Sequence, residues 1–198
     1  PDSGGRQKLN IATKVIRLSS SMLMKLPDGR SRWNAVAEAA FGLAIGVEAL
    51  DPDGIEGYTF ASKVKELNNV TAQMVMDLFE KNHPFGSTNL AGLLNVVLLQ
   101  KWKPEVPTTL IVVTDGQPDD RAAAAQVLIE ATKKMQFDEQ LAVSFIQIGN
   151  DPGATKFLQF LDDELVGMGA RFDIVDTVPV ESFGDRSLED ILLSAIND

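Results

Sequence analysis

The sequence contains no cysteine, and this absence excludes several kinds of site at once. A disulfide framework, a thiolate zinc site and a cysteine nucleophile all require thiols. Histidine is almost as scarce, because His83 is the single one in 198 residues. A nucleophile paired with an imidazole base is therefore difficult to assemble, and His83, which precedes Pro84, fits a structural role better than a catalytic one. A chain that needs no disulfide suits the reducing cytosol, so we expect a cytoplasmic protein.

Long apolar runs and an excess of positive charge are also missing. No segment approaches the roughly 18 consecutive apolar residues of a membrane-spanning helix, so we expect no membrane partner. Acidic residues outnumber basic ones by 28 to 18, which gives a formal net charge of −10. This charge argues against nucleic acid or an anionic membrane surface as the partner. It favours cationic partners, namely basic protein surfaces or metal ions.

The sequence instead alternates short apolar runs with helical stripes along its whole length. Hydrophobic residues make up 44% of the chain, which is enough for a core, and the length fits one domain, 1–198. The apolar runs predict strands at 15–18, 55–60, 63–67, 110–113, 141–148 and 172–175. The helical periodicity predicts helices from Ser31, over 71–80, 90–99 and 120–134, along the stripe 154–165, and from Ser187.

This alternation predicts an α/β fold built on a doubly wound, Rossmann-like sheet. Right-handed helical crossovers between parallel strands place helices on both faces of the sheet. We expect six strands, mostly parallel, with the polar segment 63–67 at an edge. The uninterrupted apolar run at 110–113 is typical of a central parallel strand. Ligands bind such sheets in the crevice beyond the carboxyl ends of the strands, so the residues that follow each strand are the candidates for a site.

Three polar segments are expected at that edge. Residues 19–21, all serines, follow the first strand, and residues 114–120 follow the most apolar one. Residues 86–89 precede the apolar helix 90–99 and can reach the same edge. We call this edge, with its three segments, the rim. Each segment also has an ordinary interpretation, because the serines fit a loop, Thr88 fits a helix cap and Asp115 fits a turn.

The segments Arg17-Leu18-Ser19-Ser20-Ser21-Met22, Gly86-Ser87-Thr88 and Thr114-Asp115-Gly116 resemble the three loops of a von Willebrand factor type A domain with a metal-ion-dependent adhesion site. In that family the first loop is Asp-x-Ser-x-Ser, the second supplies a Thr and the third an Asp. The resemblance covers essentially the whole chain. It implies a bound Mg²⁺ or similar hard cation, with its coordination sphere completed by an acidic side chain of a protein partner. The implied metal ligands are Ser19, Ser21, Thr88 and Asp115, and the implied partner contacts are Arg17, Ser20, Met22 and Ser87.

The first ligand position of the family pattern carries Arg17 instead of Asp. A unit charge product at about 4 Å is worth about 4 kcal/mol at an effective dielectric constant of 20, so a guanidinium here is expected to weaken or abolish metal binding. Three interpretations remain open: a degenerate natural site, an engineered or evolved change, or an Arg17 that replaces the ion and pairs with Asp115. Arg17 would also attract an acidic side chain of a second copy, so weak self-association is expected.

The expected function is a non-enzymatic, adhesion-type protein-interaction domain that binds its partner at the rim. The sequence has no Gly-x-Ser-x-Gly elbow, no phosphate-binding loop and no dinucleotide fingerprint. The enzymatic alternative is a metal-assisted hydrolase or phosphotransferase that uses Asp115, Asp119 and Asp120. Asp119 and Asp120 also fit caps of the helix 120–134. A third possibility is a subunit of a larger machine, since the family is similar to interaction domains of chelatase and proteasome-associated assemblies.

Overall fold

The computed structural model describes residues 14–17, 20–26, 29–50, 55–81 and 87–179. Its centre is a six-stranded sheet in the order β3-β2-β1-β4-β5-β6. All neighbours pair in parallel except β3, which runs antiparallel to β2 at one edge. A mostly parallel sheet with a polar edge strand was predicted, and both features are confirmed. The strands are β1 (Lys14–Arg17), β2 (Ile55–Phe60), β3 (Val64–Val70), β4 (Thr108–Thr114), β5 (Leu141–Gln147) and β6 (Val175–Pro179).

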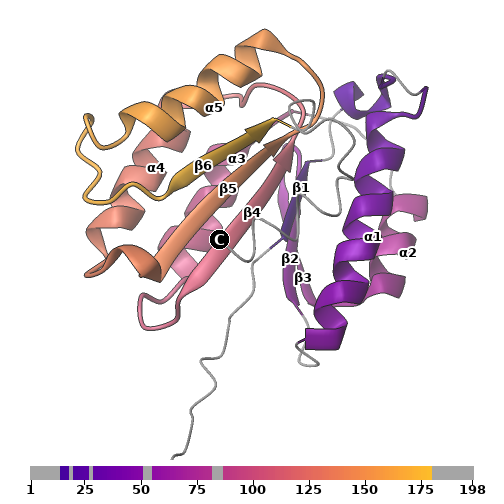
Figure 1. Ribbon diagram of the computed structural model, residues 1–198, viewed down its shortest axis with the longest axis horizontal. Helices are drawn as coiled ribbons and strands as arrows, with labels where there is room; N and C mark the ends of the chain where they lie inside the picture. The colour runs from indigo at the N-terminus through magenta and orange to yellow at the C-terminus, as the bar shows by residue number, and fades with distance from the viewer. Residues whose placement is uncertain (1–13, 18–19, 27–28, 51–54, 82–86, 180–198) are drawn as a thin grey trace, which may run out of the picture.

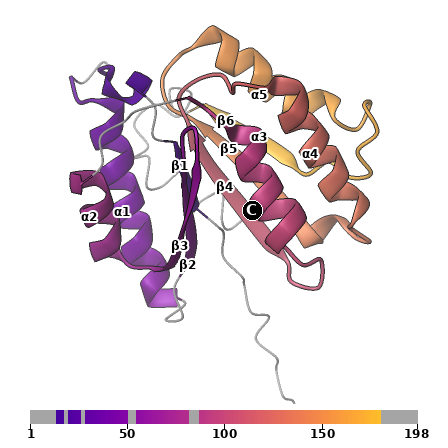
Figure 2. The same ribbon diagram turned by 180° about the vertical axis from the view of Figure 1, so that it is seen from behind.

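Helices cover both faces of the sheet, as Figures 1 and 2 show. One face carries α1 (Arg32–Leu50) and α2 (Ala72–Lys81). The other face carries α3 (Leu90–Leu94), α4 (Arg121–Lys133) and α5 (Pro152–Glu164). The helix α3 continues directly into a wider π-helical segment, η2 (Asn95–Lys101). Two short 3₁₀ turns, η1 (Ser20–Leu23) and η3 (Asp138–Gln140), lie in the connections.

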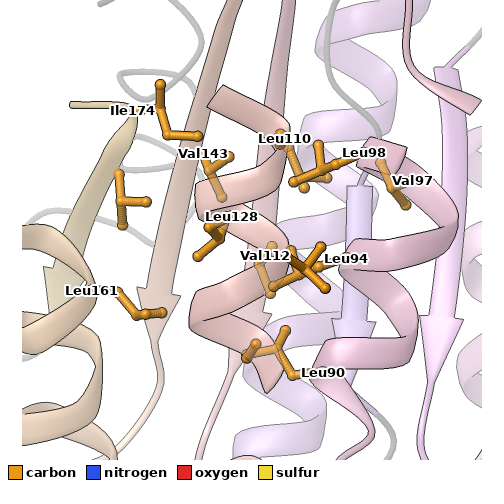
Figure 3. Close-up of a cluster of buried hydrophobic side chains, with 14 of the residues drawn as sticks. Leu90, Leu94, Val97, Leu98, Leu110, Val112, Leu128, Val143, Leu161 and Ile174 are labelled. Atoms are coloured by element: carbon orange, nitrogen blue, oxygen red, sulfur yellow. The ribbon is translucent and has the colours of Figure 1, made fainter. Parts of the chain in front are cut away.

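Each face has its own core because side chains alternate along β4. Leu110 and Val112 pack into the layer of α3, α4 and α5, where Figure 3 shows them beside Leu94 and Leu98. Ile111 and Val113 belong to the cluster that includes residues of α1 and α2. All four strand residues are buried. The uninterrupted apolar run of β4 is therefore explained by its place at the centre of a sheet that is covered on both sides.

The predicted helix 90–99 is buried as expected, but it is not one regular α-helix. Leu90, Leu94 and Leu98 line the side that faces β4 (Figure 3). The chain widens into the π-helical segment at Asn95, and the amide of Trp102 donates to the carbonyl of Val97 across five residues, at 2.8 Å. The last carbonyls of this helix receive the ammonium group of Lys134, which donates to Leu98 at 2.9 Å. A half-buried cation thus caps the end of the helix.

The last strand differs most from its prediction. It was expected at 172–175, whereas β6 spans Val175–Pro179 and shares only Val175 with that range. The chain first turns after α5 and packs Ile174 into the core, so the sheet pairing starts later. The predicted helix from Ser187 lies outside the described residues. Among the described helices, none is both long and apolar enough to cross a membrane.

Candidate functional site

The rim lies where the chain reverses its direction of travel across the sheet. From β1 the strands proceed through β2 to β3 toward one edge, and from β4 they proceed through β5 to β6 toward the other. The crevice between the carboxyl ends of β1 and β4 is therefore the topological switch point, where doubly wound sheets bind ligands. The amino end of α1 lies at the same end of the sheet as the arrowheads of β4 and β5 (Figure 1).

A buried ion pair lies at this end of the sheet, beyond the carboxyl ends of β4 and β5. Asp115, the first residue after β4, is 1% exposed, and Arg32, the first residue of α1, is 5% exposed. The Nη1 atom of Arg32 lies 3.5 Å from Oδ2 of Asp115. The two residues are 83 positions apart in the sequence. Burial keeps water and salt away from the pair, so the attraction is screened far less than at the surface.

Gly149, which follows β5, makes room for the guanidinium group. A β-carbon at this position would overlap Cζ of Arg32, so a side chain there has no space. The backbone of Gly149 also has φ +80°, in the left-handed region that favours glycine. The backbone conformation therefore favours glycine at this position, and the guanidinium of Arg32 occupies the space that a side chain would take.

The start of α1 is fixed from several sides. The amide of Arg32 donates to the carbonyl of Met24 at 2.9 Å. Ser31 caps the helix, because its hydroxyl accepts from the amide of Asn34 at 3.1 Å. The ring of Trp33 packs on Phe79 of α2, with the ring centroids 4.4 Å apart. These contacts hold the backbone of Arg32 in place, and its side chain therefore reaches Asp115 from a rigid base.

The second and third rim segments are tied together by Asp119 and Thr88. The amide of Thr88 donates to the carboxylate of Asp119 at 2.8 Å, and the amide of Asp119 donates to the carbonyl of Thr88 at 3.0 Å. Thr88 itself is buried, at 3% exposure. It does not cap the next helix, because Asn89 takes that place and accepts from the amide of Gly92. The convergence of these two segments, which was expected at the sheet edge, is observed.

Asp120 and Asp151 cap the two helices that leave the rim. The carboxylate of Asp120 accepts from the amide of Ala123 at the start of α4, at 2.9 Å. Asp151 accepts from the amide of Ala154 at the start of α5, at 2.8 Å. That backbone N–H lowers the pKa of Asp151, and smaller contributions come from Gln117 and from the positive charge of Arg32. The prediction that Asp120 caps α4 is confirmed. Asp119 instead accepts from the amide of Thr88 in the neighbouring segment.

The first rim segment is described only in part. Ser19 lies outside the described residues, as do the side chains of Arg17, Ser20 and Ser21. The backbone places Arg17 at the end of β1, in register with Phe60 of β2, and places both serines in η1. The pairing of Arg17 with Asp115 therefore stays a prediction.

The structure describes the exposure of two further predicted contacts of the rim. Ser87 is exposed, as a partner contact requires. Met22 is fully buried in the core beside α1, so its predicted contact with a partner is wrong for this conformation. The neighbouring side chains of Leu23 and Met24 point outward instead, at 60% and 56% exposure. The short 3₁₀ turn η1 explains this split, because it directs successive side chains to different sides of the chain.

Sequence reasoning missed Arg32 altogether. It stands on the helix after the cap Ser31, outside every rim segment, and a single arginine there is typical of an exposed helix start. Gly149 was missed for the same reason, since one glycine after a strand predicts only a turn. The available signal was electrostatic. A cation in the first turn of a helix opposes the helix dipole, and it therefore needs an anion close by.

The guanidinium of Arg32 opposes the binding of a divalent metal ion to Asp115. An ion bound to Oδ2 of Asp115 at the usual Mg²⁺–oxygen distance would lie at most about 5.6 Å from Nη1 of Arg32. Repulsion between the ion and the guanidinium is then about 6 kcal/mol at an effective dielectric constant of 20. Within the described part of the chain, no group of three or more histidine, aspartate or glutamate side chains could hold a metal.

No family model matches the sequence, and no curated protein matches it. Solved structures do match the fold. The PilB minor pilin from Streptococcus sanguinis is similar over 100% of this chain and 62% of the pilin, with 15% identity and a TM-score of 0.66. Manganese-loaded TRAP protein from Plasmodium vivax is similar over 94% of this chain and 72% of TRAP, with 14% identity and a TM-score of 0.59.

A third solved structure is similar over nearly the whole chain. Proximal thread matrix protein 1 from the mussel byssus, with a zinc-occupied MIDAS motif, is similar over 94% of this chain and 48% of that protein. Its identity is 17% and its TM-score 0.56. The chain spans less than two thirds of the length of this protein and of the pilin. Identities this low show the fold alone, and that fold is von Willebrand factor type A-like.

Proposed function

We propose that this chain is a non-enzymatic, adhesion-type interaction domain that binds a protein partner at the rim. The observation that carries the proposal is the convergence of the rim segments at the switch point of the sheet. Thr88 and Asp119 join two of the segments, and the third follows β1, the strand that pairs with β4. Surface loops held by a rigid sheet are the usual position for recognition in such folds.

The chemistry of the rim supports binding rather than catalysis. Each carboxylate of the enzymatic alternative already has a structural partner: Asp115 has Arg32, Asp119 has the amide of Thr88, and Asp120 has the amide of Ala123. A general base must reach the proton that it removes. Asp115, at 1% exposure, is also shielded from any substrate in solution.

The proposed contact surface combines exposed apolar and polar side chains. Leu23 and Met24 stand out from η1, and Ser87 is exposed on the neighbouring segment. Exposed large apolar side chains beside polar ones are typical of interaction sites. An acidic side chain of the partner is proposed to pair with Arg17 at the end of β1, because Arg32 is buried against Asp115.

The proposal is tested by cross-linking the domain in cells and comparing rim variants with a matched control. We expect Leu23→Asp with Met24→Asp to lose the cross-linked partner. Phe137→Asp is the control, because Phe137 is equally exposed, at 64%, but precedes β5 at the opposite end of the strands. If the rim variant keeps the partner as well as the control does, the rim is not the binding surface.

A further inference from the structure

Arg32 and Asp115 place a fixed positive charge in the crevice where the type A pattern expects a metal ion. From this geometry we infer that the guanidinium of Arg32 is the resident cation of the crevice, so that neither the fold nor the rim depends on a divalent ion. The inference rests on the buried pair and not on the proposed partner. It holds or fails whether or not the rim binds a protein.

The surroundings of Arg32 form a seat for a guanidinium group. Gly149 lies against it and leaves no room for a side chain, as the overlap of a β-carbon with Cζ shows. The carboxylate of Asp115 faces Nη1. The Nε atom is buried and has no hydrogen-bond partner among the described residues. A buried donor without a partner is costly, so the arginine is kept in place by its charge rather than by a full set of hydrogen bonds.

The position of Arg32 on its helix gives the second argument. It is the first residue of α1, where the helix dipole is positive, and the first turn of α1 contains no acidic residue. A cation at this end of a helix is destabilising unless an anion offsets it. Within the described contacts, Arg32 forms its ion pair with Asp115, the residue after β4, and its charge also interacts with the carboxylate of Asp151. The ion pair thus connects α1 to the residue after β4, a central strand in the other half of the sheet.

A metal ion and this guanidinium would compete for one carboxylate. Coordination to Asp115 would bring a divalent charge within about 5.6 Å of this guanidinium, which also interacts with the charge of Asp151. Binding of the ion is therefore opposed by the repulsion between two cations. The expected result is a domain that does not respond to divalent ions.

The first experiment is thermal unfolding of the unaltered chain in EDTA, in Mg²⁺ and in Mn²⁺. We expect the same Tm in all three conditions. A metal site present at a concentration 100 times its Kd raises the Tm of a domain of this size by about 5–10 °C. A rise of that size in Mn²⁺ over EDTA would overturn the inference.

The second experiment compares two ion pairs of the same region. Arg32→Met removes the cation that faces a buried carboxylate, and we expect the Tm to fall by about 10 °C. Arg30→Met is the matched control, because Arg30 pairs with Glu38 at the surface, where both side chains are more than half exposed. Exposed pairs contribute little. Equal Tm values for the two variants would contradict the inference.

The third variant separates the charge pair from simple packing. In Arg32→Met with Asp115→Leu both charges are replaced by apolar groups, and such replacements of buried pairs are often neutral. We expect the double variant to recover most of the lost Tm. If it is as unstable as Arg32→Met, the loss comes from packing and the role of Arg32 as resident cation is wrong.

Discussion

Thr88 and Asp119 bind each other's backbone in both directions, with the amide of Thr88 on the carboxylate of Asp119 at 2.8 Å and the amide of Asp119 on the carbonyl of Thr88 at 3.0 Å. This double contact joins a segment that precedes α3 to one that follows β4. It ties two rim segments together by hydrogen bonds within the chain.

Removal of the Asp119 carboxylate should therefore loosen the rim. Asp119→Ala leaves the buried amide of Thr88 without its charged acceptor, and we expect a loss of about 1.5–3 kcal/mol in the free energy of unfolding. Urea denaturation measures this loss. Asp138→Ala is the control, since Asp138 is exposed in η3. Equal stabilities of the two variants would show that the contact between the segments contributes nothing.

Gly149→Ala tests the seat of Arg32. The substitution strains a backbone with positive φ and also pushes a methyl group into the guanidinium. Gly169→Ala is a matched control, because Gly169 has φ +108° but no atom within 4 Å of the added carbon. We expect each variant to lose about 1 kcal/mol from backbone strain, and Gly149→Ala to lose clearly more in chemical denaturation. The additional loss of stability in Gly149→Ala should vanish when both glycine substitutions are made in the Arg32→Met variant.

The amide of Ala154 at the start of α5 lowers the pKa of Asp151. The contribution of Asp151 to stability should therefore depend on pH. A carboxyl group with a lowered pKa in the folded state stabilises the protein above its ordinary pKa, about 3.9, and this contribution disappears as the pH falls through the lowered value. Asp151→Ala should cost about 1 kcal/mol at pH 7, as the loss of a helix cap does. The difference from the unaltered chain should shrink below about pH 4. A difference that is constant from pH 7 to pH 2 would exclude the charged cap.

Self-association is the prediction that depends on Arg17. An acidic side chain of a second copy is expected to pair with Arg17 at the end of β1, which gives weak dimers of a chain with net charge −10. Sedimentation velocity over a range of concentrations should show these dimers at low salt, and Arg17→Ala should lose them. Identical sedimentation of the two proteins removes this idea.

The sheet could be predicted because its signals are local. The apolar run of β4 is long and unbroken, and a covered central strand is the structure that buries it. The segment after β5 shows the limit, since β6 starts later than its apolar residues suggested. A strand can begin only where the preceding turn ends. In this chain the turn before β6 is determined by packing against α5.

The candidate site was predictable in position but not in chemistry. Strand order places the rim segments together, so Thr88 and Asp115 were found from their places in the sequence. Arg32 was missed because its partner is 83 residues away and only the folded chain brings the two together. The burial of Met22 beside the exposed Leu23 is equally non-local, because the core of α1 decides which side chain of η1 turns inward.

Titration of the unaltered chain against Mn²⁺, followed by the electron paramagnetic resonance signal of free Mn²⁺, tests the central claim most directly. The signal reports every ion that remains in solution, and it does not depend on a partner or on an activity. With Arg32 as the cation of the crevice, the signal should follow the added Mn²⁺ as it does in buffer alone. Loss of one equivalent of signal at micromolar concentrations, abolished by Asp115→Asn, would show a metal at Asp115 and contradict the account.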